Sequence, residues 1–267
     1  MTTYNNFKIK IELLTTKWWF YLILLFLYFL PSYSKINYPP SEIPKVIVEV
    51  LKNPLISSYP VIFPIIKILM LVFVLGILIS DRINKIFAFF ISILLLAVSL
   101  FQNSAITHDY GFVILTGSLI LQLIMALSWL WEAILPQNVY SRPINFGWKW
   151  ILVPLVLLAF WFPMNNLANP DFSVTSLFAN SAMLTFCMIT PILLFLLILA
   201  FPKVNLVTFR ITSFAGLLFG SMNMVQWFML NREFWWLGVL HLPLFILAVL
   251  AISLKTKEQN GYRRSQI

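Results

Sequence analysis

The stretch VIFPIIKILMLVFVLGILIS, residues 61–80, decides the fold of this chain. Lys67 is the only charged residue in it. A helix rises about 1.5 Å per residue and the hydrocarbon core of a bilayer is about 30 Å thick, so about 20 apolar residues cross it. This stretch is therefore long enough and apolar enough to form a transmembrane helix.

Seven further stretches share this character, and the short segments between them hold nearly all the charge. The predicted transmembrane helices lie at 17–31, 59–80, 86–102, 111–132, 148–163, 174–201, 207–230 and 234–254. Only 10% of the residues are charged, against roughly 25% in a soluble domain. The sequence predicts an all-α, polytopic bundle of about eight helices, in a single membrane domain over residues 1–267 with a cytoplasmic tail at 255–267.

The positive charges are distributed unevenly between the two sides of this predicted bundle. With the N-terminus inside, 13 of the 18 Lys and Arg residues fall on the inner side, four fall outside, and Lys67 lies within a span. Because inner loops of membrane proteins are enriched in Lys and Arg, we expect both termini in the cytoplasm and the chain in the plasma membrane. The net charge of +9 follows from this topology. The basic residues form no stripe with interleaved aromatics, so we expect no nucleic-acid partner.

The first apolar segment has two interpretations. A basic leader, a short apolar run and the small-x-small pattern Ser32-Tyr33-Ser34 resemble a cleaved signal peptide. The bulky start Trp18-Trp19-Phe20-Tyr21 is more typical of an interfacial anchor, which favours a retained helix.

The first outer loop contains a separate helix signal at 42–52. Its apolar residues recur at the spacing of one helix face, and its charged residues take the opposite face. The apolar positions are Ile43, Val46, Ile47, Val50 and Leu51. A short amphipathic helix of this kind is expected to lie flat on the outer leaflet or over the mouth of the bundle.

Two outer loops share a pattern at an offset of 62 residues. Asn103 aligns with Asn165, and Asp109 aligns with Asp171. A duplicated hairpin explains the pattern, and so does a shared way of capping helix ends with Asn and Asp. A binding role for the two carboxylates is a further alternative.

Polar residues inside the predicted spans are the best indicators of function, because each costs free energy in hydrocarbon unless it meets a partner or water. Most lie in the outer halves of the helices at 111–132, 174–201, 207–230 and 234–254, which predicts an outward-facing cavity between these four helices. With the two loop carboxylates, the candidate ligand-binding residues are His241, Asn223, Gln226, Asn180, Ser181, Thr185, Asp109 and Asp171. Ordinary hydrogen bonds between helices explain the same intramembrane residues.

No cofactor, metal site or catalytic residue is predicted. Cys187 is the only cysteine, which excludes a disulfide within the chain. His241 and His108 are the only histidines, and His108 lies in a loop, so a haem with two axial histidines within the bundle is not expected. His241 is interpreted as a hydrogen-bonded structural residue, with ligand binding, proton transfer or metal ligation as alternatives.

Three other features predict contacts. Gly216 and Gly220 lie on one helix face and let another helix approach closely, either within the bundle or in a second subunit, so a homo-oligomer or a partner membrane subunit is possible through this face. Lys67 is expected to extend its ammonium toward the outer headgroups. Glu132 ends its helix at the inner boundary, where an ion pair with Arg142, Lys149 or Arg210 is expected.

These observations favour a permease or a binding subunit that handles a small solute or a lipid. A non-catalytic membrane subunit of a larger complex is the alternative. An intramembrane enzyme is the least supported class, because no motif with catalytic spacing is present.

Overall fold

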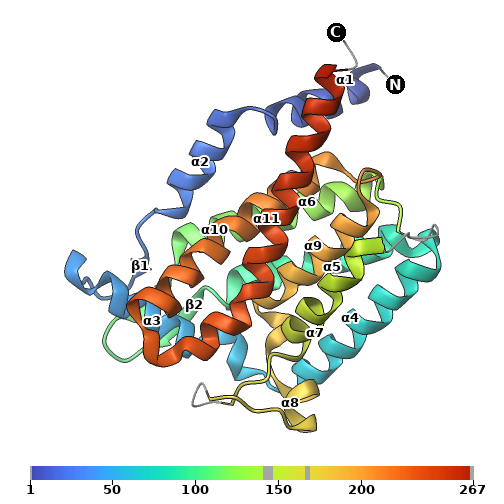
Figure 1. The fold of residues 1–267 in the computed structure, drawn as a ribbon. Coiled ribbons are helices and arrows are strands. Elements are labelled where there is room, and N and C mark those ends of the chain that lie inside the picture. Colours follow the sequence, from blue (N-terminus) through green and yellow to red (C-terminus); the bar gives the residue numbers. More distant parts are fainter. Residues whose placement is uncertain (1, 141–146, 166–168, 265–267) are drawn as a thin grey trace.

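The computed structural model describes residues 2–140, 147–165 and 169–264 of the chain, which is mostly helical (Figure 1). Four helices are long and apolar enough to cross a membrane. They are 62–79, 81–101, 116–134 and 232–254. The number rises to six if two sharply bent pairs of helices are each counted as one span. The prediction of a helical membrane bundle is confirmed at this level.

The first bent pair is N-terminal. Helix α1, Thr2–Leu14, meets α2, Trp18–Tyr28, at an angle of 73°. Helix α2 packs against α6, Thr116–Ile134. At this crossing a Cβ on Gly117 would overlap the carbonyl group of Tyr28, so the contact requires glycine. The close approach fixes α2 to the rest of the bundle.

Helices α4, Ile62–Ile79, and α5, Asn84–Phe101, are joined by a short turn. Helix α5 then pairs closely with α6 along its length. Their facing surfaces bury large side chains, including Phe87, Trp129 and Leu121. Helix α4 buries far less of its surface, which leaves an apolar face for lipid.

A three-stranded antiparallel sheet corrects the all-α prediction. Its order is β1, Tyr33–Ser34, then β3, Gly111–Ile114, then β2, Ser104–Thr107. The predicted helix at 111–132 therefore begins later, at Thr116. Helix α3, Ile43–Lys52, occupies the predicted amphipathic stretch and buries Val46 and Val50 against this sheet. We call the sheet together with α3 the sheet cap.

The second bent pair lies in the middle of the bundle. Helix α7, Val153–Trp161, precedes the short helix α8, Val174–Ala179, and α8 is followed by α9, Phe186–Ala200. The α8 segment and α9 are bent by 87°. All fifteen residues of α9 are buried, as expected for a helix that is apolar on every side. Helix α9 is thus the central element of the bundle.

The Gly216 and Gly220 face is occupied within the chain. Both residues lie on α10, Leu206–Val225, which ends in a π-helical segment, Gln226–Leu230, before α11, Trp235–Arg264. A Cβ at Gly220 would come within 2.9 Å of the Phe245 Cα of α11, and one at Gly216 would lie 3.3 Å from the Ala248 Cβ. Of the two predicted contacts of this face, the structure shows the one within the bundle, because α11 packs on it.

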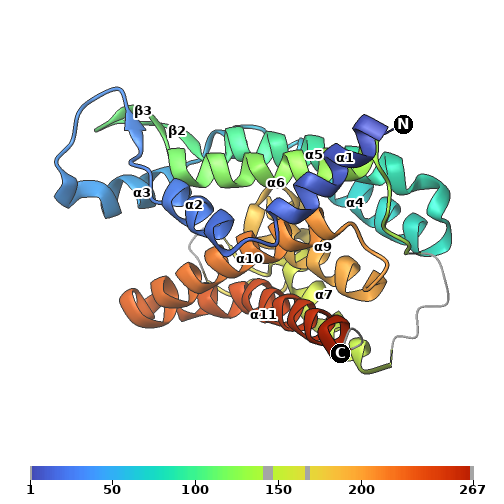
Figure 2. The same ribbon diagram turned by 90° about the horizontal axis from the view of Figure 1, so that it is seen from above.

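The two ends of the molecule differ. Helix α1 and the last turns of α11 lie at one end, whereas the sheet cap and the start of α11 lie at the opposite end (Figure 1). The view from above shows the same separation (Figure 2). The predicted tail is mostly a continuation of α11, which reaches Arg264.

Candidate functional site

The candidate site is the break between α8 and α9, residues Asn180–Thr185. Three of the predicted ligand-binding residues, Asn180, Ser181 and Thr185, lie in these six positions. The segment interrupts an apolar run that the sequence predicts as one helix, 174–201. Backbone groups freed by such an interruption need partners inside the protein or a water-filled space at this depth.

Asn180 supplies partners for several of the freed backbone groups. Its Nδ2 donates to the carbonyl oxygens of Trp161, at 2.7 Å, and Phe162, at 3.0 Å. Its Oδ1 accepts from the N–H of Ala182 at 3.1 Å. Phe162 ends α7 in the left-handed region, with φ of 52°, so the last carbonyls of α7 turn away from the helix and are free to accept. Asn180 therefore joins the end of α7 to the end of α8.

The start of α9 is held by a residue that the sequence did not indicate. Gln102, just after α5, accepts from the N–H of Phe186 through Oε1 at 2.9 Å. The Thr185 hydroxyl donates to the Ser181 carbonyl at 3.1 Å, which closes the turn before α9. Gln102 is 84 residues away from Phe186 in the chain. No local pattern predicts that contact.

Lys67 of α4 lies beside the break, and its position corrects the prediction that it extends to the headgroups. The side chain is completely buried. Its Nζ donates to the Leu177 carbonyl at 2.7 Å and to the Trp161 carbonyl at 3.4 Å, and it lies 5.4 Å from the centre of the Phe160 ring. The Trp161 carbonyl thus accepts from both Lys67 and Asn180.

Asn223 of α10 contacts the first turn of α9. Its Nδ2 donates to the Phe219 carbonyl at 2.8 Å and lies 3.5 Å from the Cys187 Sγ, and its Oδ1 accepts from the Trp227 indole at 3.0 Å. Cys187 is the second residue of α9 and is buried. Asn223 is therefore the fourth predicted residue near the break.

The remaining candidates lie elsewhere. His241 of α11 is buried, and its Nδ1 lies 2.7 Å from the Leu237 carbonyl in the preceding turn. A carbonyl only accepts, so Nδ1 carries the proton. Gln226 begins the π-helical segment, and its carbonyl accepts from the Asn231 N–H. Asp171 accepts from the Ser173 N–H at 2.9 Å, just before α8.

Asp109 belongs to the sheet cap. Its carboxylate lies 2.9 Å from the Lys45 Nζ of α3 and 3.0 Å from the ring of His108. The hydrogen bond and charge of Lys45, followed by those of His108, lower the pKa of Asp109. Nearby, the hydroxyl of Tyr110 donates to Glu42 at 2.7 Å, and this bond raises the pKa of Tyr110. Asp109 therefore holds α3 on the hairpin and does not share the position of Asp171.

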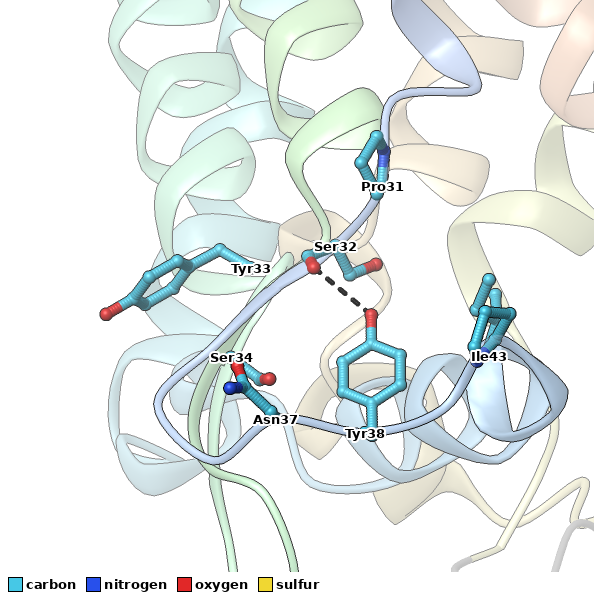
Figure 3. A pocket seen from close by; sticks show the side chains of 8 residues that line it. Pro31, Ser32, Tyr33, Ser34, Asn37, Tyr38 and Ile43 are labelled. Atoms are coloured by element: carbon cyan, nitrogen blue, oxygen red, sulfur yellow. Dashed lines mark hydrogen bonds between the residues drawn. The ribbon is translucent and has the colours of Figure 1, made fainter.

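A shallow hollow of about 400 Å³ lies in the loop before α3 (Figure 3). Its lining is uncharged and comprises Pro31, Ser32, Tyr33, Ser34, Asn37, Tyr38, Pro40 and Ile43. The hydroxyl of Tyr38 donates to the Ser32 carbonyl at 3.1 Å across it. The hollow contains none of the eight predicted ligand-binding residues.

A second buried polar region, here called the Glu132 cluster, surrounds Glu132 at the end of α6. Glu132 is 1% exposed, and its Oε1 accepts from the N–H groups of Gln137 and Asn138, both at 2.9 Å. Asn138 in turn accepts from the Asn205 N–H at 2.7 Å and the Asn84 Nδ2 at 2.9 Å. The cluster therefore ties the loop after α6 to the starts of α5 and α10.

Lys149, one of the three predicted ion-pair partners of Glu132, binds backbone carbonyls instead of the carboxylate. The Lys149 Nζ donates to the carbonyls of Ile198, at 2.9 Å, and Leu199, at 3.1 Å, at the end of α9. Arg142, another predicted partner, lies outside the described residues. Arg210 donates to the Glu12 carbonyl and to the Thr15 hydroxyl of the N-terminal region.

Within the described part of the chain, no three His, Cys, Asp or Glu side chains are grouped so that they could hold a metal ion. No protein-family model, curated protein or solved structure significantly matches this chain.

Proposed function

We propose that this protein is a permease, or a binding subunit of one, that takes up a small solute or a lipid at the break between α8 and α9. The observation that carries the proposal is the interruption of a central apolar span by Asn180–Thr185. Discontinuous helices near the middle of a membrane often form the substrate sites of transporters, because the interrupted backbone and its polar neighbours can bind a ligand.

The topology that we propose has eight crossings. The six candidate spans are joined by α7 with its preceding turn, Gly147–Trp161, and by α10. An even number of crossings places both termini on one side, which agrees with the common end occupied by α1 and the last turns of α11 (Figure 1). The excess of Lys and Arg in the segments at that end supports a cytoplasmic location of both termini in the plasma membrane.

The break is proposed to open toward the outer side of the membrane. Ser181 and Thr185 are partly exposed, whereas Thr190, one turn farther along α9, is fully buried. Asn223 and Cys187 extend the polar region toward α10. Gln102 and Lys67 extend it toward α5 and α4, so residues of five helices converge on the break.

Accessibility of the break to water tests this proposal. Cys187 is the only cysteine, so Cys187→Ser gives a background without thiols. On that background, Ser181→Cys is expected to react with a membrane-impermeant methanethiosulfonate added outside intact cells. The matched control is Thr190→Cys, which is expected to react at least about tenfold more slowly because that position is fully buried. Equal and negligible labelling of both variants would contradict the proposal and favour a non-catalytic subunit.

A further inference from the structure

We propose that Lys67 recognises an anionic group, a carboxylate or a phosphate, on the solute or lipid that binds at the break. This inference rests on the function proposed above and specifies the chemical class of its ligand. Its first support is the positive charge of Lys67, which has no nearby carboxylate as a counter-ion. Among the residues that the structure describes, no Asp or Glu oxygen lies within 4 Å of the Lys67 Nζ.

The groups around Lys67 solvate its charge without neutralising it. An ammonium has three N–H donors, and the carbonyls of Leu177 and Trp161 take two of them. The Phe160 ring contributes a further weak attraction. All of these groups are formally neutral, so the site keeps a net positive charge. A buried charge of this kind costs free energy unless a counter-ion joins it, and a charged residue inside a membrane span is generally functional.

The position of Lys67 is suited to a ligand at the break. Helix α4 packs against α8 and against the turn between α8 and α9. The carbonyl of Trp161 accepts from both Lys67 and Asn180, which places the ammonium and the amide on the same side of the break. An anion at this position gains the charge of Lys67 and the third N–H donor of its ammonium. A cation at the same position would be repelled.

A purely structural role for Lys67 is the competing explanation. Trp161 is the last residue of α7 and Leu177 lies in α8, and cations are favourable near the ends of helices where carbonyls lack partners. Lys149 has such a role at the other end of the bundle, since its Nζ donates to two carbonyls at the end of α9. Lys149 therefore provides a matched control for the test.

The test compares two reagents of opposite charge at one thiol. In the Ser181→Cys, Cys187→Ser protein, the labelling rates of an anionic and a cationic methanethiosulfonate are measured, and each is divided by the rate of the same reagent with a free thiol. The normalised rate of the anionic reagent is then divided by that of the cationic reagent. A fixed positive charge raises this anion-to-cation ratio. Lys67→Met is expected to lower the ratio by roughly tenfold or more, the size expected for one charge in a partly buried site. Lys67→Arg should keep it, and Lys149→Met should leave it unchanged.

An unchanged ratio in Lys67→Met would overturn the inference while leaving the proposed function intact, because the thiol would still be accessible. If Lys67→Met does not fold, Lys67→Gln provides the same comparison with a polar side chain. Failure of both reagents to label Ser181→Cys contradicts the proposed function itself. The two failures are therefore distinguishable.

The source of the anion is tested by protection of the same thiol in proteoliposomes. Slower labelling in the presence of inorganic phosphate indicates a soluble anion. Protection by phosphatidylglycerol in the bilayer, with phosphatidylcholine as the control lipid and no effect of phosphate, indicates a lipid. Protection of either kind should be lost in Lys67→Met. Absence of protection by both probes would overturn the assignment of an anionic ligand.

Discussion

Lys67 and Glu132 are both buried charges, yet the protein surrounds them in different ways. Glu132 binds N–H groups five and six residues ahead of it in the chain, so its carboxylate closes a loop. Lys67 binds carbonyls that are 94 and 110 residues away, and both belong to the segments before the break in a central span. The comparison indicates that Glu132 stabilises the fold, whereas the fold accommodates the charge of Lys67 without depending on it.

The largest effect on stability is expected from Glu132→Leu. The substitution keeps a similar volume but removes the acceptor of two N–H groups, and each buried N–H without a partner costs about 1–3 kcal/mol. We expect a loss of roughly 3 kcal/mol, measured as a lower midpoint of thermal unfolding in detergent. Glu132→Gln retains one side-chain oxygen as an acceptor and should lose only about 1 kcal/mol.

A Glu132→Leu protein as stable as the original chain would break the comparison, because the carboxylate would then have no structural role. The same measurement on Asn205 or Asn84 variants is less informative. Those side chains contact several other groups in and around the Glu132 cluster, and their effects are not independent of one another.

The sequence predicts the apolar helices well and the tertiary contacts poorly. Candidate membrane spans follow from composition, since a run such as 61–80 is long and apolar enough to cross a bilayer as a helix. The hairpin of β2 and β3 was missed because Gly111–Ile114 is apolar and continues directly into α6. Phe112 and Val113 consequently seemed part of a helix, and only the pairing with β2 distinguishes them.

The candidate site could be predicted only in part for a similar reason. Asn180, Ser181 and Thr185 are polar residues in an apolar run, which the sequence shows directly. The bend that they create is not visible, because the apolar run continues on both sides of it. Lys67 was expected at the headgroups, since a lysine stem can reach them from that depth. Its carbonyl partners come from distant segments, and no periodicity along α4 indicates them.

A smaller effect on stability is expected from Lys67→Met, and this prediction sharpens the comparison. The Trp161 carbonyl keeps its bond from Asn180, and carbonyls lacking one partner are tolerated better than N–H groups. Replacing an incompletely compensated charge by an apolar side chain also removes its desolvation cost. We expect a change of no more than about 1 kcal/mol in the same unfolding assay. A loss as large as that of Glu132→Leu would show that Lys67 is structural.

The smallest effect is expected at the exposed ion pair of Asp109 and Lys45, which serves as a reference for exposed charges. Lys45 lowers the pKa of Asp109 below its ordinary value of 3.8. A carboxyl group with a lowered pKa in the folded state stabilises that state above its unfolded pKa, and the stabilisation is lost as the pH falls through the folded value. Attachment of α3 to the hairpin should therefore be constant between pH 7 and pH 5 and weaken only below pH 3.8.

Hydrogen exchange of the amides of α3 measures this attachment. Asp109→Asn should show slightly faster exchange at neutral pH and a smaller increase in exchange as the pH falls below 3.8. The effect is small because both partners are exposed and screened by salt. Complete release of α3 in Asp109→Asn would contradict the comparison. An exposed ion pair would then stabilise the structure as much as the buried Glu132 does, and burial would not explain why charged groups of this protein differ in their contribution to stability.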